Sequence, residues 1–311
     1  MKKRLYGDTS KYVSEVGFGG WQLGNKQDWG DMEDSVSIAL IHEALDRDVN
    51  FFDSSPNYGR GKSEELLGKA LVGKRSGVVI NTKFGHTADG FTEFSVDKIK
   101  ESIEQSLRRL QTDYVDSILL HNPPFEYLDG KYGHFKLLEE LKTEGKILSY
   151  GVSVDSSREM FEVINKTNIG VIEVMFNIFY QETAEAFKLA KEKNIAIIVK
   201  VPLDSGWLSG KYNSLSTFEG VRSRWTPEVI SKRSELLEKI KFISDENTTM
   251  TMAALRFILS YPEVTTVIPG VRNIAQLNEN VSTSAATMPG EYVKKLQDLW
   301  DNEIKFKNLG W

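Results

Sequence analysis

The sequence contains no cysteine and no long apolar run. The absence of cysteine excludes disulfide bonds, thiolate metal sites and thiol nucleophiles, and it suits a reducing compartment such as the cytosol. No segment approaches the roughly 20 apolar residues that a helix needs to span a bilayer. The basic start, residues 1–4, leads straight into a Gly7-Asp8 turn, so we expect no signal peptide and a cytoplasmic protein.

An excess of charge of one sign is also missing. The 39 basic and 44 acidic residues are interspersed, and the formal net charge is -5. This balance provides neither a basic face for nucleic acid nor a polybasic anchor for a membrane. Because His42, His86 and His134 lack metal-ligand spacing, we expect no metal. We expect a soluble protein that acts on a small molecule, either as a monomer or as a homo-oligomer.

The sequence does have a regular alternation of short apolar runs and amphipathic segments. Runs rich in β-branched and aromatic residues predict buried strands at Val16–Gly19, Val49–Asp53, Val78–Lys83, Val115–His121, Ile147–Ser153, Val171–Asn177, Ile195–Val201 and Val264–Pro269. Helix signals between them include the pattern Asp97–Leu110, a capping box at Ser156 and Glu159, the Thr226-Pro227 pair, and Asn273 followed by Gln276. Each predicted strand is followed by a helix.

This alternation requires a parallel sheet, either open and doubly wound or closed into a barrel. Eight strand–helix units in 311 residues match the closed barrel. No Gly-x-Gly-x-x-Gly motif follows an early strand, since Gly17–Gly20 runs into Trp21 rather than into a helix. We therefore predict a single domain over residues 1–311 with the (β/α)8 TIM-barrel fold.

Three segments depart from the alternation. Residues 2–14 carry a turn between two β-prone pieces, which predicts an N-terminal β-hairpin that closes the bottom of the barrel. The stretch from Leu203 to Thr226 is too long for an ordinary connection and indicates a functional loop. Residues 289–311 read as a helix with an apolar end, which could cover the barrel or lie against a partner subunit.

Four ionisable residues follow the ends of predicted strands. Asp53, Lys83 and His121 each end a strand, and Tyr58 lies just after Asp53. Because active sites of such barrels lie at the carboxyl ends of the strands, we expect all four side chains to meet there. A lysine that ends an apolar run needs an opposite charge, which Asp53 would supply. We expect Lys83 to lower the pKa of Tyr58 and His121 to hydrogen-bond a substrate oxygen.

Each of these residues also has a purely structural interpretation. Asp53 could organise the turn or cap a helix, Tyr58 could be an aromatic residue at the lip, and His121 could stabilise its own loop. Lys83 could instead serve a lyase or isomerase as a Schiff-base nucleophile. A third reading is a regulatory or redox-sensing subunit that binds a cofactor on the same scaffold with little catalysis.

The same residues carry a family resemblance. The segment Phe52-Asp53-Ser54-Ser55-Pro56-Asn57-Tyr58-Gly59, followed by Ser63-Glu64, resembles the aldo-keto reductase signature around its catalytic Asp and Tyr. Further similar segments, in the family's order, are Thr82-Lys83, Leu119-Leu120-His121, Gly145–Ser153, Pro202–Tyr212 and Ile268–Asn280. The resemblance covers nearly the whole chain. It implies an NADP(H)-dependent oxidoreductase that reduces aldehydes or ketones by reversible hydride transfer, with Asp53, Tyr58, Lys83 and His121 as its catalytic residues.

The resemblance also implies a set of cofactor contacts. Gly20, Trp21 and Asp53 would lie at the nicotinamide end with Ser153, Val154 and Glu173, and Pro202, Leu203, Ser205, Gly206, Leu208, Gly210 and Lys211 would follow the pyrophosphate. Gly270, Arg272, Gln276 and Asn280 would hold the adenosine portion. Val154 and Glu173 stand where many members have Asn and Gln. A guanidinium at Arg272 suits a 2′-phosphate, which favours NADP(H) over NAD(H), and Arg222 or Arg224 could share that role.

Overall fold

The computed structural model describes residues 1–310 and contains one eight-stranded parallel sheet. Its strands follow one another in chain order: Phe18–Gly19 (β3), Phe51–Asp53 (β4), Val79–Phe84 (β5), Val115–His121 (β6), Ile147–Val154 (β7), Val171–Met175 (β8), Ala196–Lys200 (β9) and Val264–Val267 (β10). Parallel bridges join Val16 to Val267 and Gly19 to Gly270, so the first and last strands meet. The predicted (β/α)8 barrel is confirmed.

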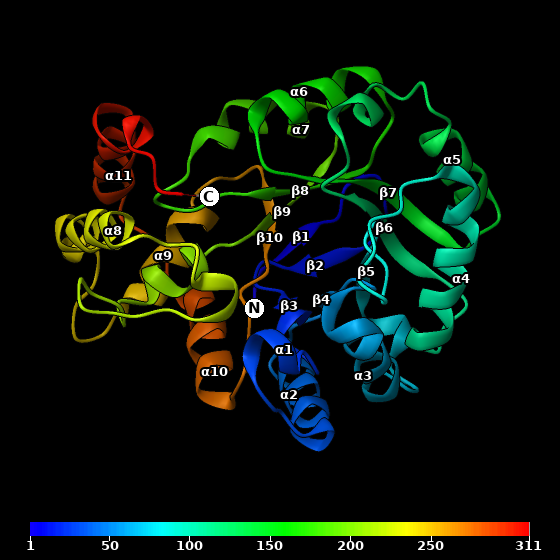
Figure 1. Ribbon diagram of the computed structural model, residues 1–311, viewed down its shortest axis with the longest axis horizontal. Helices are drawn as coiled ribbons and strands as arrows, with labels where there is room; N and C mark the ends of the chain where they lie inside the picture. Colours follow the sequence, from blue (N-terminus) through cyan, green and yellow to red (C-terminus); the bar gives the residue numbers. More distant parts are fainter. Residues whose placement is uncertain (311) are drawn as a thin grey trace.

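Helices surround the strands on the outside of the barrel (Figure 1). The connecting helices are Asp34–Asp46 (α2), Lys62–Ala70 (α3), Ile99–Leu110 (α4), His134–Thr143 (α5), Ser157–Lys166 (α6), Phe187–Glu192 (α7), Met250–Leu259 (α9) and Ile274–Ser282 (α10), with a short helix Lys26–Trp29 (α1). The predicted start signals are confirmed: Ser156 and Glu159 form a capping box, and the side chains of Thr226 and Asn273 cap Pro227–Lys239 (α8) and α10.

The N-terminal hairpin closes the amino-terminal end of the barrel, as predicted. Its strands Lys3–Leu5 (β1) and Tyr12–Ser14 (β2) pair antiparallel. Tyr6 and Val13 are fully buried and join the apolar side chains inside the barrel. The Tyr6 hydroxyl lies 2.6 Å from Ser117 Oγ, which satisfies its polar atom in that interior.

Several strands end earlier than the sequence indicates. The strand β9 stops at Lys200 because Val201 has a φ of 52°, which is rare for a β-branched residue and incompatible with a strand. The strand β8 stops at Met175, since Asn177 turns to bridge Tyr180. The strand β10 ends at Val267, two residues before Pro269, which cannot donate a ladder hydrogen bond. The tightly bent segments that result all lie at one end of the barrel.

Two further helices lie outside the strand–helix alternation. Helices α8 and Gly290–Asn302 (α11) lie next to each other at one side of the barrel (Figure 1). On α8, the Arg233 side chain is fully buried, pairs with Asp204 at 2.8 Å, and donates to the backbone oxygen of Leu309. The chain end therefore packs on its own barrel, next to the segment from 203 to 226. No helix within residues 1–310 has both the length and the apolar character needed to cross a membrane.

Candidate active site

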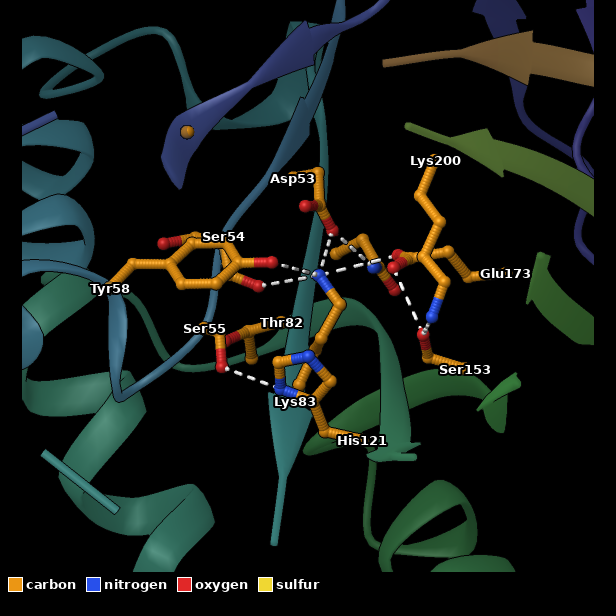
Figure 2. A network of polar contacts seen from close by, with 12 residues as sticks. Asp53, Ser54, Ser55, Tyr58, Thr82, Lys83, His121, Ser153, Glu173 and Lys200 are labelled. Carbon is orange, nitrogen blue, oxygen red and sulfur yellow. Dashed lines mark hydrogen bonds and ion pairs between the residues drawn. The ribbon is translucent and has the colours of Figure 1, made fainter. Parts of the chain in front are cut away.

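Lys83 lies at the centre of a buried polar cluster (Figure 2). Its ammonium is 2.6 Å from Asp53 Oδ1, 3.1 Å from the backbone oxygen of Ser54, 3.5 Å from the hydroxyl of Tyr58 and 3.3 Å from Glu173 Oε2. The expectation that Asp53 pairs with Lys83 is confirmed. The structure thus brings Asp53 and Tyr58 within hydrogen-bonding distance of the Lys83 ammonium.

The strands position these residues through their two-residue period. Alternate side chains of a barrel strand point inward, so Phe51 and Leu119 lie one layer below Asp53 and His121. On β5 the inward residue below Lys83 is Asn81, and Val79 lies one layer further down. The same alternation makes Ser153, Glu173 and Lys200 point inward, in the layer nearest the carboxyl-terminal end of the barrel. This layer of polar residues faces the carboxyl-terminal mouth, and the apolar layer beneath it shields it from the opposite end.

Burial dominates the electrostatics of the cluster. It raises the pKa of Asp53 to about 7, assisted by the charge of Glu173 and opposed by Lys83. Burial alone would lower the pKa of Lys83, but the carboxylates of Asp53 and Glu173 raise it well above its usual range. Lys83 is therefore a permanent cation at neutral pH, held by two carboxyl groups.

The expected lowering of the Tyr58 pKa is wrong for this state of the protein. Burial raises the pKa of Tyr58 above its ordinary value, and it outweighs the opposite effect of the Lys83 charge. Asp53 and Glu173 add to the increase. The phenol is consequently protonated at neutral pH, which makes it a proton donor rather than a base.

His121 lies beside the phenol and is neutral. Its ring is 6.1 Å from the Tyr58 ring, and its Nδ1 lies 3.2 Å from the hydroxyl of Ser55. Burial, followed by the charges of Lys83 and Lys200, holds the pKa of His121 well below its usual range. A neutral imidazole with one nitrogen directed at Ser55 can offer the other to a substrate oxygen.

A cleft of about 1020 Å³ opens above the cluster. It is lined by Asp53, Tyr58, His121 and these predicted cofactor residues: Trp21, Glu173, Pro202, Leu203, Ser205, Gly206, Lys211, Gly270, Arg272, Gln276 and Asn280. Lys83 lies beneath this surface, fully buried. The cleft extends from the catalytic candidates to the start of α10. Its lining includes residues of both predicted cofactor segments, Pro202–Tyr212 and Ile268–Asn280.

The remaining predicted cofactor residues do not line the cleft. Val154 and Leu208 are buried in the apolar core between the sheet and the helices, because Val154 follows an inward-pointing serine and so points outward. Ser153 lies below the surface, bonded to Lys200 and Glu173. Gly20 is buried with its oxygen bonded to Ser63, and Gly210 is exposed outside the cleft. Side-chain contacts of Val154 and Leu208 with a ligand in the cleft are therefore not supported.

Some lining residues were not predicted. Gln22, Trp29, Asp155 and Glu279 are among them, whereas Arg222 and Arg224, which the sequence had offered as partners for a 2′-phosphate, line the cleft as well. The guanidinium of Arg222 stacks 4.6 Å above the Trp29 ring and so bridges the cleft wall. Asp155 could have been found by continuing the inward parity of Ser153, whereas the short helix that carries Trp29 has no sequence signal.

The backbone at the start of the long loop is strained. Val201, Asp204 and Ser205 have φ angles of 52°, 47° and 52°, and Val201 and Ser205 line the cleft. Such conformations cost free energy and persist only where the surroundings hold them. The buried ion pair between Asp204 and Arg233 supplies that restraint. The predicted functional loop is thus held rigidly at its cleft end.

The fold and the site together define a (β/α)8 barrel with a buried ionisable cluster at its mouth, and comparisons with known proteins assign its family. Residues 15–301 match the sequence model of the Aldo/keto reductase family. The chain is 30% identical over 313 residues to the uncharacterized oxidoreductase YqkF of Bacillus subtilis, with 98% of each chain covered. It is 28% identical to the NADH-specific methylglyoxal reductase of Escherichia coli, with 96% of this chain and 100% of that protein covered.

A solved structure gives the same answer. The holo form of the aldo-keto reductase AKR11C1 from Bacillus halodurans superposes with a TM-score of 0.81 at 29% identity, and 96% of each chain is covered. The chain belongs to the aldo-keto reductase family of oxidoreductases.

Proposed function

We propose that the protein is an NADP(H)-dependent reductase of small aldehydes or ketones, with Tyr58 as the proton donor. The observation that carries this proposal is the protonated phenol of Tyr58 at the floor of a large cleft, 3.5 Å from the Lys83 ammonium. An ammonium at that distance stabilises the phenolate that remains after a proton has been given away. Tyr58 as a proton donor and Lys83 as a stabilising charge support carbonyl reduction, which needs no nucleophilic side chain.

The cleft suits a nicotinamide dinucleotide. Two buried polar atoms on its wall, Gln22 Oε1 and Asn280 Nδ2, have no hydrogen-bond partner among the described residues, so they offer contacts to a ligand. A Cβ at Gly270 would lie 2.2 Å from Gln22 Nε2, so the glycine leaves room for the Gln22 side chain in this wall. The bound dinucleotide would supply the hydride that reduces the carbonyl carbon.

The residues of this chain would handle the proton and the orientation. His121 would donate a hydrogen bond to the carbonyl oxygen and hold it near the Tyr58 hydroxyl. Tyr58 would then transfer its proton to that oxygen, and Lys83 would stabilise the resulting phenolate. Asp53 would keep Lys83 in place through their 2.6 Å contact. In the reverse direction the phenolate would accept the proton of an alcohol.

The cofactor preference rests on Arg272. It is exposed at the rim of the cleft, and none of the ion pairs found among residues 1–310 includes its guanidinium. A guanidinium with free donors binds a 2′-phosphate as a charged fork. Gln276 accepts from the Arg272 backbone N–H at 2.9 Å and so fixes the turn that presents it. The Escherichia coli relative is an NADH-specific methylglyoxal reductase, which makes NAD(H) the alternative to test.

The proposal is tested by Tyr58→Phe, with the exposed Tyr132→Phe as the matched control. Loss of a general acid lowers turnover by about 10²- to 10⁴-fold. We expect that loss in NADPH oxidation with a panel of small aldehydes and ketones, while the Kd for NADPH changes by less than about twofold, because the ring remains. Turnover retained by Tyr58→Phe, or a lysine adduct trapped by borohydride, would refute the assignment.

A further inference from the structure

Two carboxylates share the single ammonium of Lys83. Asp53 Oδ1 lies 2.6 Å from it on one side and Glu173 Oε2 lies 3.3 Å from it on the other (Figure 2). The side chains of all three residues are at most 2% exposed. The proposed proton transfer uses Asp53, Lys83 and Tyr58 but gives no role to Glu173.

A second lysine is connected to Glu173 through a serine. Lys200 Nζ donates to Ser153 Oγ at 2.8 Å, and Ser153 Oγ donates to Glu173 Oε1 at 3.1 Å. Lys200 also lies 2.8 Å from Asn122 Oδ1 and 3.0 Å from Asp155 Oδ1, which anchor its ammonium. The row Lys200–Ser153–Glu173–Lys83 therefore runs from the cleft surface to the buried centre (Figure 2).

The charges explain why the row is needed. One buried ammonium with two carboxylates leaves an unbalanced negative charge, and such a charge is costly away from water. Lys200, whose side chain is only 14% exposed, brings a second positive charge to within two hydrogen bonds of Glu173 and is held there by Asp155. Without Glu173, the full charge of Lys83 would act on Asp53 and the phenol alone.

We propose that Glu173 and Lys200 are a positioning pair that sets how much of the Lys83 charge the Tyr58 phenol experiences. Glu173 offsets part of that charge and holds the ammonium between two carboxylates. Lys200, acting through Ser153, fixes Glu173 and balances it. The consequence for Tyr58 rests on the proposed function, whereas the pairing of charges does not.

The titratable and charged groups that face this centre come from every surrounding strand. They are Asp53 and Tyr58 after β4, Lys83 on β5, His121 on β6 with His86 beside it, Asp155 after β7, Glu173 on β8 and Lys200 on β9, with Tyr6 and Asp116 further below. Among these, Glu173 raises the pKa of Asp53 and of Tyr58. Its removal should lower both.

The first test measures the cofactor-free protein. Because the pKa of Asp53 is raised to about 7 on folding, its ionisation removes stability as the pH rises from about 4 to about 7. Glu173→Gln keeps the shape and can still accept from Ser153, but it removes the charge. We expect urea unfolding to show that this pH-dependent loss ends about one pH unit lower in Glu173→Gln.

Three further variants make the test specific. Lys200→Met should move the same transition upward, Lys200→Arg should restore it, and the double variant Glu173→Gln/Lys200→Met should return close to wild type because both charges are gone. The exposed Glu185→Gln makes the same change in net charge outside the cluster and should leave the transition unchanged. Identical pH profiles for Glu173→Gln and wild type, or for Lys200→Met and wild type, would overturn the pairing.

The second test measures the reaction. Oxidation of an alcohol requires the ionised phenol, whose pKa lies above its ordinary value, so the rate of oxidation at a fixed pH below that pKa reports the ionised fraction. In Glu173→Gln a fall of about one pH unit in this pKa should raise the rate of alcohol oxidation at about pH 8 about tenfold, with KM for the carbonyl substrate within about twofold of wild type. An altered KM with an unchanged rate of oxidation would show a structural role only. A protein that reduces no carbonyl compound would refute the proposed function and leave the unfolding test of the pairing intact.

Discussion

The replacement Lys83→Met tests the electrostatic account most directly. The methionine fills a similar volume but leaves Asp53 and Glu173, both at most 2% exposed, without their common cation. Removing one partner of a buried ion pair costs about 3–5 kcal/mol, because the remaining charge has lost its compensation. The full loss should appear only where Asp53 is ionised.

The size of this loss should therefore depend on pH. The pKa of Asp53 is about 7 with Lys83 present, and without the cation it rises further. A carboxyl group whose pKa is raised in the folded state makes the protein less stable as the pH increases. The variant should therefore be least stable at alkaline pH. At pH 5 protonation of Asp53 removes its charge, and the remaining loss should be about 1–2 kcal/mol from missing hydrogen bonds.

The assay is urea unfolding of the cofactor-free protein at pH 5 and pH 9. We expect the destabilisation relative to wild type to be about 2–3 kcal/mol larger at pH 9 than at pH 5. The exposed Lys69→Met serves as the matched control and should be near neutral at both pH values. Adding Asp53→Asn to Lys83→Met should recover part of the alkaline loss. An equal destabilisation at both pH values would refute this reasoning.

Three other substitutions test the cofactor rim, the strained loop and the barrel packing. Arg272→Ala should weaken NADPH binding by about ten- to a hundredfold and NADH binding by less than threefold, since a charge-assisted contact is worth about 1.5–3 kcal/mol; equal weakening in binding titrations would count against the phosphate role. Arg233→Met should lower the free energy of unfolding by about 3–5 kcal/mol, because Asp204 stays buried without its partner; a loss below 1 kcal/mol would contradict this. Gly151→Ala should prevent stable folding, since its Cβ would lie 1.6 Å from a backbone oxygen of the neighbouring strand, whereas Gly77→Ala meets nothing within 4 Å and should be tolerated in thermal unfolding.

The catalytic candidates could be predicted because each depends on local information. Asp53, Lys83 and His121 end apolar runs whose β-branched composition marks buried strands, and the period of two places them on the inner face. The capping signals at Ser156, Thr226 and Asn273 are local as well, and all three gave the helix starts that the structure has. The same alternation would have shown that Val154, which follows the inward-pointing Ser153, points away from the cleft.

Other features depend on contacts between distant segments. Sequence spacing cannot show that Glu173 reaches an ammonium 90 positions earlier, because that distance depends on how the strands tilt and stagger on closing. The position of Trp29 under Arg222 depends on two loops that only the barrel mouth brings together. The Tyr58 pKa was predicted in the wrong direction because the Lys83 contact was visible in the sequence but the depth of burial was not.

The sequence by itself determined the order of strands and helices, the closure into a barrel, and the residues at the strand ends, because these follow from periodicity and local chain preferences. The tertiary structure alone decided which carboxylate faces which ammonium and how far the phenol is from water. Those quantities depend on distances between strands and on the local dielectric, and neither exists until the barrel has closed.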